Sequence, residues 1–395
     1  MGAIDGLNIL AVNAGSSTLK FALWVGTDPV ARGKVAFARN AHEPTKITVV
    51  DQNGATLREE ELTSSAHDVA VDWLANWIVS RGGRLDAVAH RIVHGGQRFC
   101  APTFLDDANL AELRALSPLA PLHQSNNLDL VDAFRHRFPE VPSIGCFDTA
   151  FHRTLPAIEY SYALPRYLRD SGIRRFGFHG LSYQFIAQRV AEARGTVEGR
   201  IVACHLGSGV SMCGMLDGVS RATTMGFTPL EGLPMGTRSG TIDPGAVIFM
   251  QTELRLSPER IADTLYRESG LLGLSGVSSG FQDLFISDDP AASFAIDHFC
   301  YRASRELASL ASAIGGIDAV VFTGGAGERS SELRSRILDR LTWLGVLLDR
   351  EANESHHERI SDTKSAVEVY VVPTDEESVL AAQATALLIA TPRTE

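Results

Sequence analysis

An internal repeat limits most strongly what this chain can fold into. The segment ILAVNAGSS at 9–17 aligns with IVACHLGSG at 201–209, with isoleucine, alanine, glycine and serine at matched positions. DAVAHRIVHGG at 86–96 resembles DAVVFTGGAGE at 318–328, and a weaker pair, IGCFD and VVPTD, follows later in each half. Each piece has the pattern of a buried strand that runs into a turn or ends in an acid. Similar pieces in the same order predict a duplicated α/β domain with a cleft between its copies.

The chain length predicts two domains. At 395 residues, each half is long enough to bury a core of its own. We expect an N-terminal domain at 1–150, completed by a C-terminal helix at 378–395, and a C-terminal domain at 151–377. After the FHG turn, the apolar pattern predicts a helix at about 182–194 with Ser182 as its N-cap.

Composition and charge exclude several classes of partner. The 36 basic and 47 acidic residues leave a net charge of -11, which argues against nucleic-acid or anionic-membrane surfaces. The five scattered cysteines contain no CxxC pair, so neither a disulfide framework nor a zinc site is expected. The N-terminus lacks the pattern of a signal peptide, and no run of 18 apolar residues occurs. We therefore expect a cytoplasmic protein that binds neither nucleic acid nor membranes.

The segment from His205 to Gly245 is unusually rich in glycine, with nine of the chain's 35 glycines. Glycine at this density lets the backbone approach a ligand closely. The segment also carries polar groups suited to a phosphate or a metal. These groups are His205, Ser208, Ser211, Thr223, Thr224, Arg238 and Asp243. A surface loop is the simpler interpretation of one short piece, but the length of the segment and its apolar runs favour a ligand-binding site.

Three glycine-containing turns are suited to phosphate. NAGSSTLK offers backbone N–H groups, hydroxyls and Lys20 to one anion. HLGSG is its counterpart in the second half, and the two turns facing each other would suit a nucleoside triphosphate. TGGAGE opens a helix after a strand, which suits an approach of adenosine or phosphate. No segment matches the P-loop spacing GxxxxGK[ST].

Two arginines and two acids have the chemistry that phosphoryl transfer requires. Arg91 and Arg238 lie in the settings HRIVHGG and MGTRSG, and arginine can hold the equatorial oxygens of a migrating phosphoryl group. Asp148 and Glu376 follow strands and could hold Mg²⁺, which prefers carboxylate and water. A surface ion pair is the alternative for either arginine taken singly.

Together these blocks resemble the acetate kinases. The chain carries, in the order of that family and from residue 9 to about 380, the segments NAGSSTLKF, HRIVHGG, LAPLH, FDTAFH, RRFGFHG, HLGSG, TTMGFTPLEGLPMGTRSGTIDPG and TGGAGE. The resemblance implies duplicated ribonuclease-H-like domains of the sugar kinase/Hsp70/actin superfamily, with an interdomain cleft. It also implies a homodimer that transfers the γ-phosphoryl group of ATP to acetate, reversibly, with nucleotide and dimer contacts in the C-terminal domain.

The resemblance further implies roles for residues of the first half. Asn13 and Arg91 would contact the migrating phosphoryl group. Asn13, Asp148 and Glu376 would hold Mg²⁺ or Mn²⁺, and Asp148 would also assist the acetate. Transfer would be direct and in line, without a phosphoenzyme.

In the second half, Arg238 would hold the acetate carboxylate and, with His179, the equatorial oxygens of the transition state. His123 of the first half would add a further donor. Both histidines lie among apolar residues, where a structural core histidine is the usual alternative. A small apolar pocket would surround the acetate methyl group, formed by Val93, Leu122, Phe178 and Pro229. Because one methylene changes binding by only about 1–3 kcal/mol, a propionate or short-chain acid kinase is the nearest alternative.

The remaining implied contacts hold the phosphates and nucleotide. They are Ser16, Thr18, Lys20, His205, Gly207, Ser208, Gly209, Gly280, Phe281, Gln282, Gly325, Gly327 and Arg329. Four of these depart from the family pattern, namely Ser208, Gly280, Gln282 and Arg329. The same acceptor with a non-ATP donor such as pyrophosphate is therefore a second alternative, and a non-catalytic nucleotide-binding protein of the same fold is a third.

Overall fold

The computed structural model describes residues 6–15, 18–37, 43–62, 67–81 and 84–391. Contacts within the chain form two compact units. Unit 1 comprises Met1–Phe151 and Asp375–Glu395, and unit 2 comprises His152–Thr374. The segment of Asp375, Glu376 and Glu377, which we expected at the end of the C-terminal domain, thus groups with unit 1.

Unit 1 is built on an eight-stranded mixed sheet in the order β5-β4-β3-β2-β1-β6-β8-β7. Its strands are β1 (Asn8–Ala14), β2 (Thr18–Val25), β3 (Asp28–Ala36), β4 (Thr45–Val50), β5 (Thr56–Leu62), β6 (Ala87–Ile92), β7 (Thr103–Phe104) and β8 (Ser143–Phe147). Strands β1 to β5 form an antiparallel meander, whereas β6 is parallel to both β1 and β8. The carboxyl ends of β1, β6 and β8 therefore meet at one edge of the sheet, which is where ligands bind in open α/β sheets.

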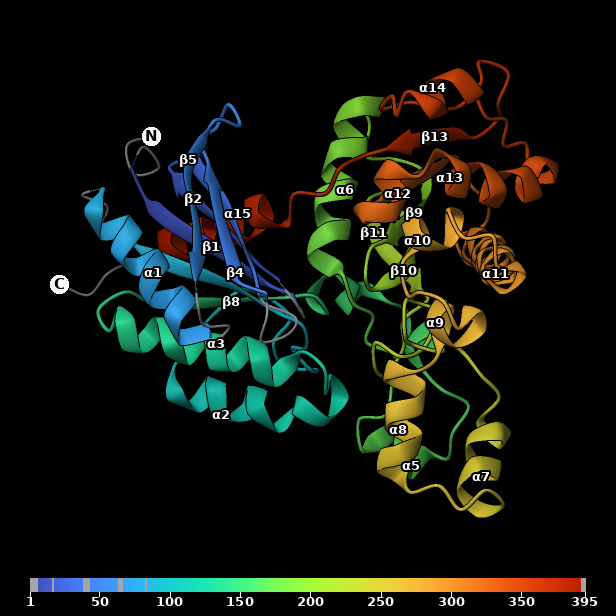
Figure 1. Ribbon diagram of the computed structural model, residues 1–395, viewed down its shortest axis with the longest axis horizontal. Coiled ribbons are helices and arrows are strands. Elements are labelled where there is room, and N and C mark those ends of the chain that lie inside the picture. The colour runs from blue at the N-terminus through green and yellow to red at the C-terminus, as the bar shows by residue number, and fades with distance from the viewer. Residues whose placement is uncertain (1–5, 16–17, 38–42, 63–66, 82–83, 392–395) are drawn as a thin grey trace. The chain divides into compact units, whose positions relative to one another are not determined.

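Helices cover this sheet with apolar side chains. The helical segments are α1 (His67–Ser80), α2 (Asp107–Ala115), α3 (Gln124–Arg137), α15 (Glu376–Ala390) and the 3₁₀ turns η1 (Ser117–Leu119) and η2 (Ala150–Thr154). Helices α1 and α3 pack on one side of the strands, as Figure 1 shows, and form a core with side chains such as Leu10, Phe21, Leu74 and Phe134. Helix α15 packs against β1, β2, β6 and β8. The Phe21 ring fills the space that a Cβ at the paired Gly33 would need, 2.2 Å away.

Unit 2 repeats the central part of this topology in a five-stranded sheet with the order β11-β10-β9-β12-β13. Its strands are β9 (Arg200–Leu206), β10 (Val210–Leu216), β11 (Val219–Thr223), β12 (Ala319–Thr323) and β13 (Glu368–Val371). Three antiparallel strands are followed by two parallel ones, as in β3-β2-β1-β6-β8 of unit 1. The first pair of matched sequence segments falls on β1 and β9, and the second pair falls on β6 and β12. The repeat therefore correctly predicted a duplicated α/β architecture.

Helices flank the second sheet as well. They are α4 (Ala157–Tyr160), α5 (Arg166–Asp170), α6 (Gly180–Arg194), α7 (Pro244–Thr252), α8 (Pro258–Arg267), α9 (Gly270–Ser275), α10 (Phe281–Phe285), α11 (Pro290–Ala313), α12 (Gly324–Arg329), α13 (Ser331–Leu338), η3 (Asp339–Leu344) and α14 (Arg350–Glu354). Helix α11 packs on β9, β10 and β11, and α6 packs on β9, with the strands lying between these two helices in Figure 1.

The start of α6 corrects one prediction. The helix begins at Gly180, and its N-cap is His179, in the left-handed conformation with φ 59° and ψ 26°. Ser182, which we expected as the N-cap, lies inside the first turn and is fully buried. Its hydroxyl hydrogen-bonds the His205 ring instead of the helix backbone. The pattern of apolar residues located the helix but not the residue that begins it, because the chain reverses sharply at His179.

Two further observations concern the class of protein. Among the described residues, no helix is long and apolar enough to cross a membrane. All five cysteines are free thiols, and Cys146, Cys204, Cys213 and Cys300 are buried. Burial raises the pKa of the Cys213 thiol to about 12, so this thiol stays protonated at neutral pH.

Candidate functional site

The residues expected at the site form two groups, one in each unit. The first group lies at the carboxyl edge of the unit 1 sheet. Asn13 and Arg91 are the next-to-last residues of β1 and β6, and Asp148 directly follows β8. Strand β6 is parallel to both β1 and β8, and the registers place these three residues at the same level of the sheet. Side chains far apart in the sequence therefore form one polar cluster.

Arg91 is the centre of this cluster. Its Nε lies 3.2 and 3.1 Å from the two oxygens of Asp148, and a terminal nitrogen donates to Asp148 Oδ2 at 2.7 Å. The other terminal nitrogen donates to Asn13 Oδ1 at 3.2 Å. Burial opposes the charge of Arg91, but the carboxylates of Asp148 and Glu376 outweigh burial and raise the pKa of Arg91. The guanidinium is therefore held charged and in one orientation.

The start of α15 brings two more acids to the same edge. Asp375 caps the helix by accepting a hydrogen bond from the Ser378 N–H, and Arg32 of β3 donates to both Asp375 oxygens at 3.0 and 2.6 Å. Glu376 and Glu377 follow directly in the first helical turn. The amide of Asn13 donates to Glu376 Oε2 at 2.8 Å and to Glu377 Oε1 at 2.9 Å.

Negative charge exceeds positive charge in this cluster. Three carboxylates, Asp148, Glu376 and Glu377, surround the Arg91 guanidinium. Burial and then the charge of Glu376 raise the pKa of Glu377, with Lys20 acting in the opposite direction. Among the described residues, no group of three or more His, Cys, Asp or Glu is arranged to hold a metal ion. The set that the sequence predicted, two carboxylates and an amide oxygen, still fits Mg²⁺, because this ion keeps several waters and takes few protein ligands.

The NAGSSTLK turn is described only in part. Ser16 lies outside the described residues. Thr18 and Lys20 belong to β2, where Lys20 pairs with Asn13 across the hairpin, and the Gly15 N–H donates to the Thr18 carbonyl at 2.7 Å. Lys20 is therefore held beside the polar cluster by strand register.

Residues expected to meet the acetate methyl group divide between the units. In unit 1, Val93 is buried just after β6, whereas Leu122 and His123 are half-buried at the start of α3. In unit 2, Phe178 and Pro229 are both buried. The loop around Val93 is held by polar side chains that were not predicted from the sequence.

Those side chains come from the first turns of α3. Asn127 accepts from the Val93 N–H at 3.2 Å and donates to the Ala14 carbonyl at 3.3 Å. Gln124 accepts from the His94 N–H at 3.0 Å and donates to its carbonyl at 2.9 Å. A buried amide can satisfy the backbone of a loop in this way, but no local spacing in the sequence reveals which loop it will bind.

The second group of site residues surrounds the HLGSG turn of unit 2. The His179 and His205 rings stack with centroids 4.3 Å apart and planes inclined by 20°. A Cβ at Gly209 would lie 2.9 Å from His179 Nε2 and 3.1 Å from a terminal nitrogen of Arg238. An imidazole and a guanidinium thus converge on one glycine of the hairpin turn. Such a pair of donors at a side-chain-free position can hold the oxygens of an anion.

Arg238 is buried without an acidic partner among the described residues. Its NH1 donates to the Pro229 carbonyl at 2.9 Å, and burial lowers its pKa to about 10. The turn that carries it is fixed by Met235 N–H, which donates to the Arg238 carbonyl, and by Gly270, whose missing side chain leaves room for that backbone. At neutral pH the guanidinium remains charged, and a bound anion would compensate the cost of its burial.

The TGGAGE turn lies against the same hairpin. A Cβ at Gly324, which has φ 76°, would lie 2.9 Å from the Gly207 nitrogen, so only glycine permits this approach. Glu328 accepts from the Gly324 N–H at 2.9 Å and ties the turn together. Arg329 is exposed and folds back, with its Nε donating to the Gly325 carbonyl at 3.2 Å. The turn's Gly327 is buried beside Leu206.

A buried arginine that sequence analysis missed holds this turn from behind. Arg334 is fully buried and donates from NH1 to the carbonyls of Gly327 and Glu328 at 2.8 and 2.9 Å. Its Nε and its other terminal nitrogen bind the side chain and carbonyl of Asn353. Burial lowers the pKa of Arg334 to about 10. An RSRIL pattern in a helix predicts an exposed arginine, so burial could not be foreseen.

The expected adenosine loop leads into α10. Gly280 is the N-cap of that helix, and Phe281 packs edge-on against Phe299 of α11 with centroids 4.7 Å apart. Gln282 is exposed. Ser208, the other departure from the family pattern, is exposed in the HLGSG turn.

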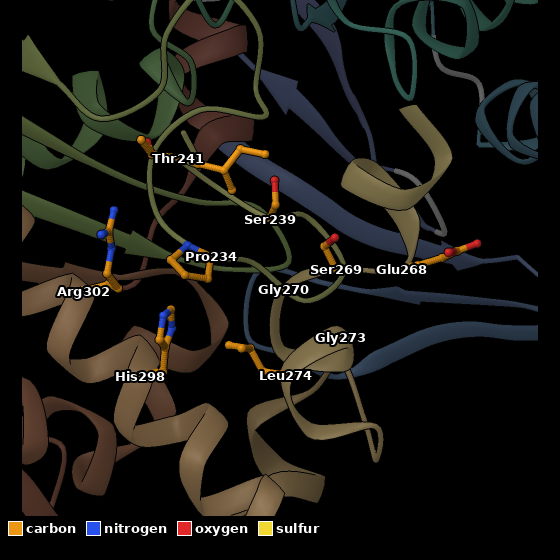
Figure 2. Close-up of a pocket in the computed structure, with 11 residues that line it drawn as sticks. Pro234, Ser239, Thr241, Glu268, Ser269, Gly270, Gly273, Leu274, His298 and Arg302 are labelled. Atoms are coloured by element: carbon orange, nitrogen blue, oxygen red, sulfur yellow. The ribbon is translucent and has the colours of Figure 1, made fainter. Parts of the chain in front are cut away.

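A cavity of about 410 Å³ lies beside the turn that carries Arg238. Pro234 and Ser239 border it on the turn, Gly270 borders it on α9, and His298 and Arg302 on α11, as Figure 2 shows. None of the described residues that we expected at the site lines this cavity. The predicted site is instead made of side chains around the HLGSG turn and the carboxyl edge of the first sheet.

Comparison with known proteins bears on what these clusters do. The model of the acetokinase family matches residues 8–382. The acetate kinase of Rhodopseudomonas palustris is 47% identical over 384 residues, which cover 94% of this chain and 96% of that protein. The acetate kinase of Porphyromonas gingivalis superposes with a TM-score of 0.84 at 33% identity, covering 97% and 100% of the two chains. A propionate kinase from Francisella tularensis superposes with a TM-score of 0.88 at 31% identity, covering 95% and 98%. The chain therefore belongs to the acetokinase family.

Proposed function

We propose that this chain transfers the γ-phosphoryl group of ATP to acetate, reversibly, giving acetyl phosphate and ADP. The observation that carries this proposal is the convergence of His179 Nε2 and the Arg238 guanidinium on Gly209. In a chain of the acetokinase family, this pair of donors is suited to the equatorial oxygens of a phosphoryl group in transfer.

In this proposal each unit supplies one side of the chemistry. Asn13 and Arg91 contact the migrating phosphoryl group from unit 1, and Arg91 is oriented for this by Asp148. From unit 2, Arg238 holds the acetate carboxylate, and His179 donates to a phosphoryl oxygen; His123 adds a further donor. The carboxylate oxygen of acetate attacks phosphorus in line as the bond to ADP breaks, so no phosphoenzyme forms.

Mg²⁺ or Mn²⁺ is the proposed metal, held by Asp148, Glu376 and Asn13. The gathering of Asp148, Glu376 and Glu377 around Arg91 supports this, because carboxylates are ligands that such an ion prefers. When bound there, the ion would neutralise charge on the donor phosphates. Asn13 would then serve both as a ligand and as the group that orients Glu376 and Glu377.

The phosphates and nucleotide are proposed to bind along the glycine turns. Besides Ser16, Thr18 and Lys20, the contacts are His205, Gly207, Ser208, Gly209, Gly280, Phe281, Gln282, Gly325, Gly327 and Arg329. Arg329 lies over Gly325, where it would meet the donor. Pyrophosphate is the second candidate donor, because it would use the cation of Arg329 without needing an adenosine contact at Gly280 or Gln282.

The side chains proposed for the acceptor pocket favour acetate as the phosphoryl acceptor, and propionate is the second candidate acceptor. Val93, Leu122, Phe178 and Pro229 are proposed to contact the methyl group, and the buried, branched Val93 leaves less room than a smaller side chain would. The structural similarity to a propionate kinase keeps the longer acid in consideration. One methylene changes the transition-state free energy by about 1–3 kcal/mol, so discrimination should be partial.

A donor and acceptor panel tests these proposals together. ATP, GTP and pyrophosphate would each be combined with acetate and propionate in the presence of Mg²⁺, and acyl phosphate trapped with hydroxylamine. We expect the highest kcat/KM for ATP with acetate. Background rates with every pair would contradict the proposed function and favour a nucleotide-binding protein without activity, whereas activity with pyrophosphate alone would change only the donor.

We further propose a cytoplasmic homodimer joined through α7 and its neighbours. No residue of this apolar helix is buried, and Ile248 is 60% and Phe249 54% exposed. Leu254, just after the helix, is 57% exposed. Apolar surface gathered on one element is typical of an interface. Light scattering on Ile248→Asp/Phe249→Asp should show monomers, whereas the control Ile158→Asp, at an exposed apolar residue elsewhere in unit 2, should stay dimeric. A monomeric wild-type protein would contradict the proposal.

A further inference from the structure

Ser211 joins His179 to a buried tyrosine that sequence analysis did not single out. Ser211 Oγ lies 2.7 Å from His179 Nδ1, and the same oxygen makes a short hydrogen bond with the hydroxyl of Tyr183. Ser211 and Tyr183 are both 0% exposed. The Ser211 hydroxyl is therefore buried and bound to these two side chains, and the phosphate contact that its place in the glycine-rich segment suggested is not available to it.

The hydrogen bonds around Tyr183 set the direction of this chain of hydroxyls. Burial raises the pKa of Tyr183 well above its ordinary value, so the phenol is protonated. The phenol hydrogen is then directed at Ser211 Oγ. Because that oxygen accepts from Tyr183, the Ser211 hydrogen is directed at His179 Nδ1.

A neighbouring histidine shows the same pattern where the direction is unambiguous. His152 Nε2 lies 2.9 Å from the Phe178 carbonyl oxygen, which can only accept, so Nε2 carries the hydrogen. His152 Nδ1 therefore accepts from the Ser220 hydroxyl at 2.8 Å. The bond from His152 Nε2 also holds the Phe178 carbonyl, which directly precedes His179 and its left-handed backbone.

We propose that Tyr183 and Ser211 are positioning residues that fix His179 in the tautomer with hydrogen on Nε2. This inference rests on the proposed phosphoryl transfer. Nε2 is the atom that faces Gly209 beside the Arg238 guanidinium. With hydrogen on Nε2, His179 donates to an oxygen of the migrating phosphoryl group. With hydrogen on Nδ1, a lone pair would face that oxygen and repel it.

The surroundings also favour a neutral ring. The Arg238 guanidinium approaches the same point as Nε2, and a second positive charge there would be repelled. His205 stacks on the ring at 4.3 Å. A neutral imidazole with a fixed tautomer gives the site one hydrogen-bond donor without a second cation. A hydrogen bond from a neighbouring side chain to the other ring nitrogen is a general means of fixing a histidine's tautomer.

Substitutions at position 211 provide a matched pair. Ser211→Thr keeps the hydroxyl, and Ser211→Val has nearly the same shape without it. We expect Ser211→Val and Tyr183→Phe to lower kcat by roughly 10- to 100-fold, with KM for acetate and ATP changed less than about threefold. Ser211→Thr should keep most of kcat. Equal kcat values for the Thr and Val variants would overturn the proposal.

The tautomer itself can be observed without turnover. Long-range ¹H–¹⁵N spectra of protein labelled with ¹⁵N-histidine distinguish the two neutral tautomers and the imidazolium, and loss of one signal in His179→Gln assigns it. We expect wild-type His179 to be neutral with hydrogen on Nε2, and Ser211→Val to lose that pattern. A wild-type His179 signal from the Nδ1–H tautomer or the imidazolium would overturn the proposal even if the Ser211 and Tyr183 variants unfolded. Absence of acetyl phosphate synthesis by the wild type, with the expected tautomer present, would contradict only the proposed function.

Discussion

Arg91 hydrogen-bonds both carboxylate oxygens of Asp148, and the terminal nitrogen contact, at 2.7 Å, is the shortest of these bonds. The Asp148 side chain is 1% exposed and that of Arg91 15%. The two groups therefore neutralise each other away from water, and Arg91 reaches Asn13 only from the orientation that Asp148 imposes.

Removing the charge of Asp148 should thus destabilise unit 1. Asp148→Asn leaves a buried guanidinium without its main partner, and we expect a loss of about 3 kcal/mol in the free energy of unfolding, measured in urea. The matched control is Glu377→Gln in the same cluster. Because burial and Glu376 already raise the Glu377 pKa, this change should cost less than about 1 kcal/mol. Equal losses of unfolding free energy in the two variants would show that the Arg91–Asp148 ion pair does not provide the expected extra stability.

Arg238 should affect transfer far more than donor binding. Arg238→Ala removes a donor that faces Gly209, and we expect kcat to fall by roughly 10²- to 10³-fold while KM for ATP changes by less than about threefold. Steady-state kinetics of acetyl phosphate formation would measure both constants. Arg260→Ala is the control, because Arg260 is an exposed arginine of the same unit paired with Glu268. Proportional losses in kcat and ATP affinity would contradict the role of Arg238.

Gly209 should tolerate no side chain in an active protein. A methyl group there would lie 2.9 Å from His179 Nε2 and 3.1 Å from Arg238, in the space proposed for the phosphoryl oxygens. We expect Gly209→Ala to lower kcat/KM for acetate by at least about 100-fold with little change in the unfolding midpoint. Gly6→Ala, where a Cβ meets nothing within 4 Å, provides the comparison. Retained activity in Gly209→Ala would exclude this position as the point of transfer.

Stability should fall as pH falls through the range from about 6.5 to 4. Burial lowers the pKa of His90 to about 3 and that of His152 to about 4. The unfolded histidines bind protons near their ordinary pKa of about 6.5, so the unfolded state holds more protons in this window and folding is disfavoured. Each histidine should remove about 1.4 kcal/mol per pH unit below 6.5.

Urea unfolding at pH 7.0, 6.0, 5.0 and 4.5 would measure this dependence. His152→Gln keeps a side chain that can donate to the Phe178 carbonyl and accept from Ser220, and its stability should vary less steeply with pH. Identical slopes in the variant and the wild type would contradict the assignment of this pH dependence to His152.

Local patterns predicted much of the architecture. The repeat of strand and turn segments predicted the matching strand orders around β1 and β9. The resemblance to the acetate kinases predicted the family and the enzyme class, a phosphotransferase with a carboxyl acceptor. Both agree with relatives that match nearly the whole chain. The strand ends at Asn13, Arg91 and Asp148 were also recognisable, because parallel strands bring their carboxyl ends to one edge. The roles of these three residues in the reaction remain proposals.

Other features had no local signal. The pattern around Ser182 predicted an N-cap there, but the N-cap is His179. Its left-handed conformation lies between contacts with Ser211 of β10 and with His152, which are distant in the sequence. Arg334 lies in a helix whose charge pattern indicates exposure, yet it is fully buried and holds the carbonyls of the glycine turn.

The sequence by itself determined the strands, the glycine turns and the family, because these depend on residue type and short spacing. Only the tertiary structure decided which groups meet. Asn13 contacts Glu376 and Glu377 across more than 360 positions of chain, since β1 and the start of α15 share one sheet edge. His179, Ser211 and Tyr183 form one line of hydrogen bonds because α6 packs beside β9 and β10. Such contacts depend on strand register and helix packing, and these are fixed by the core of each unit rather than by neighbours in sequence.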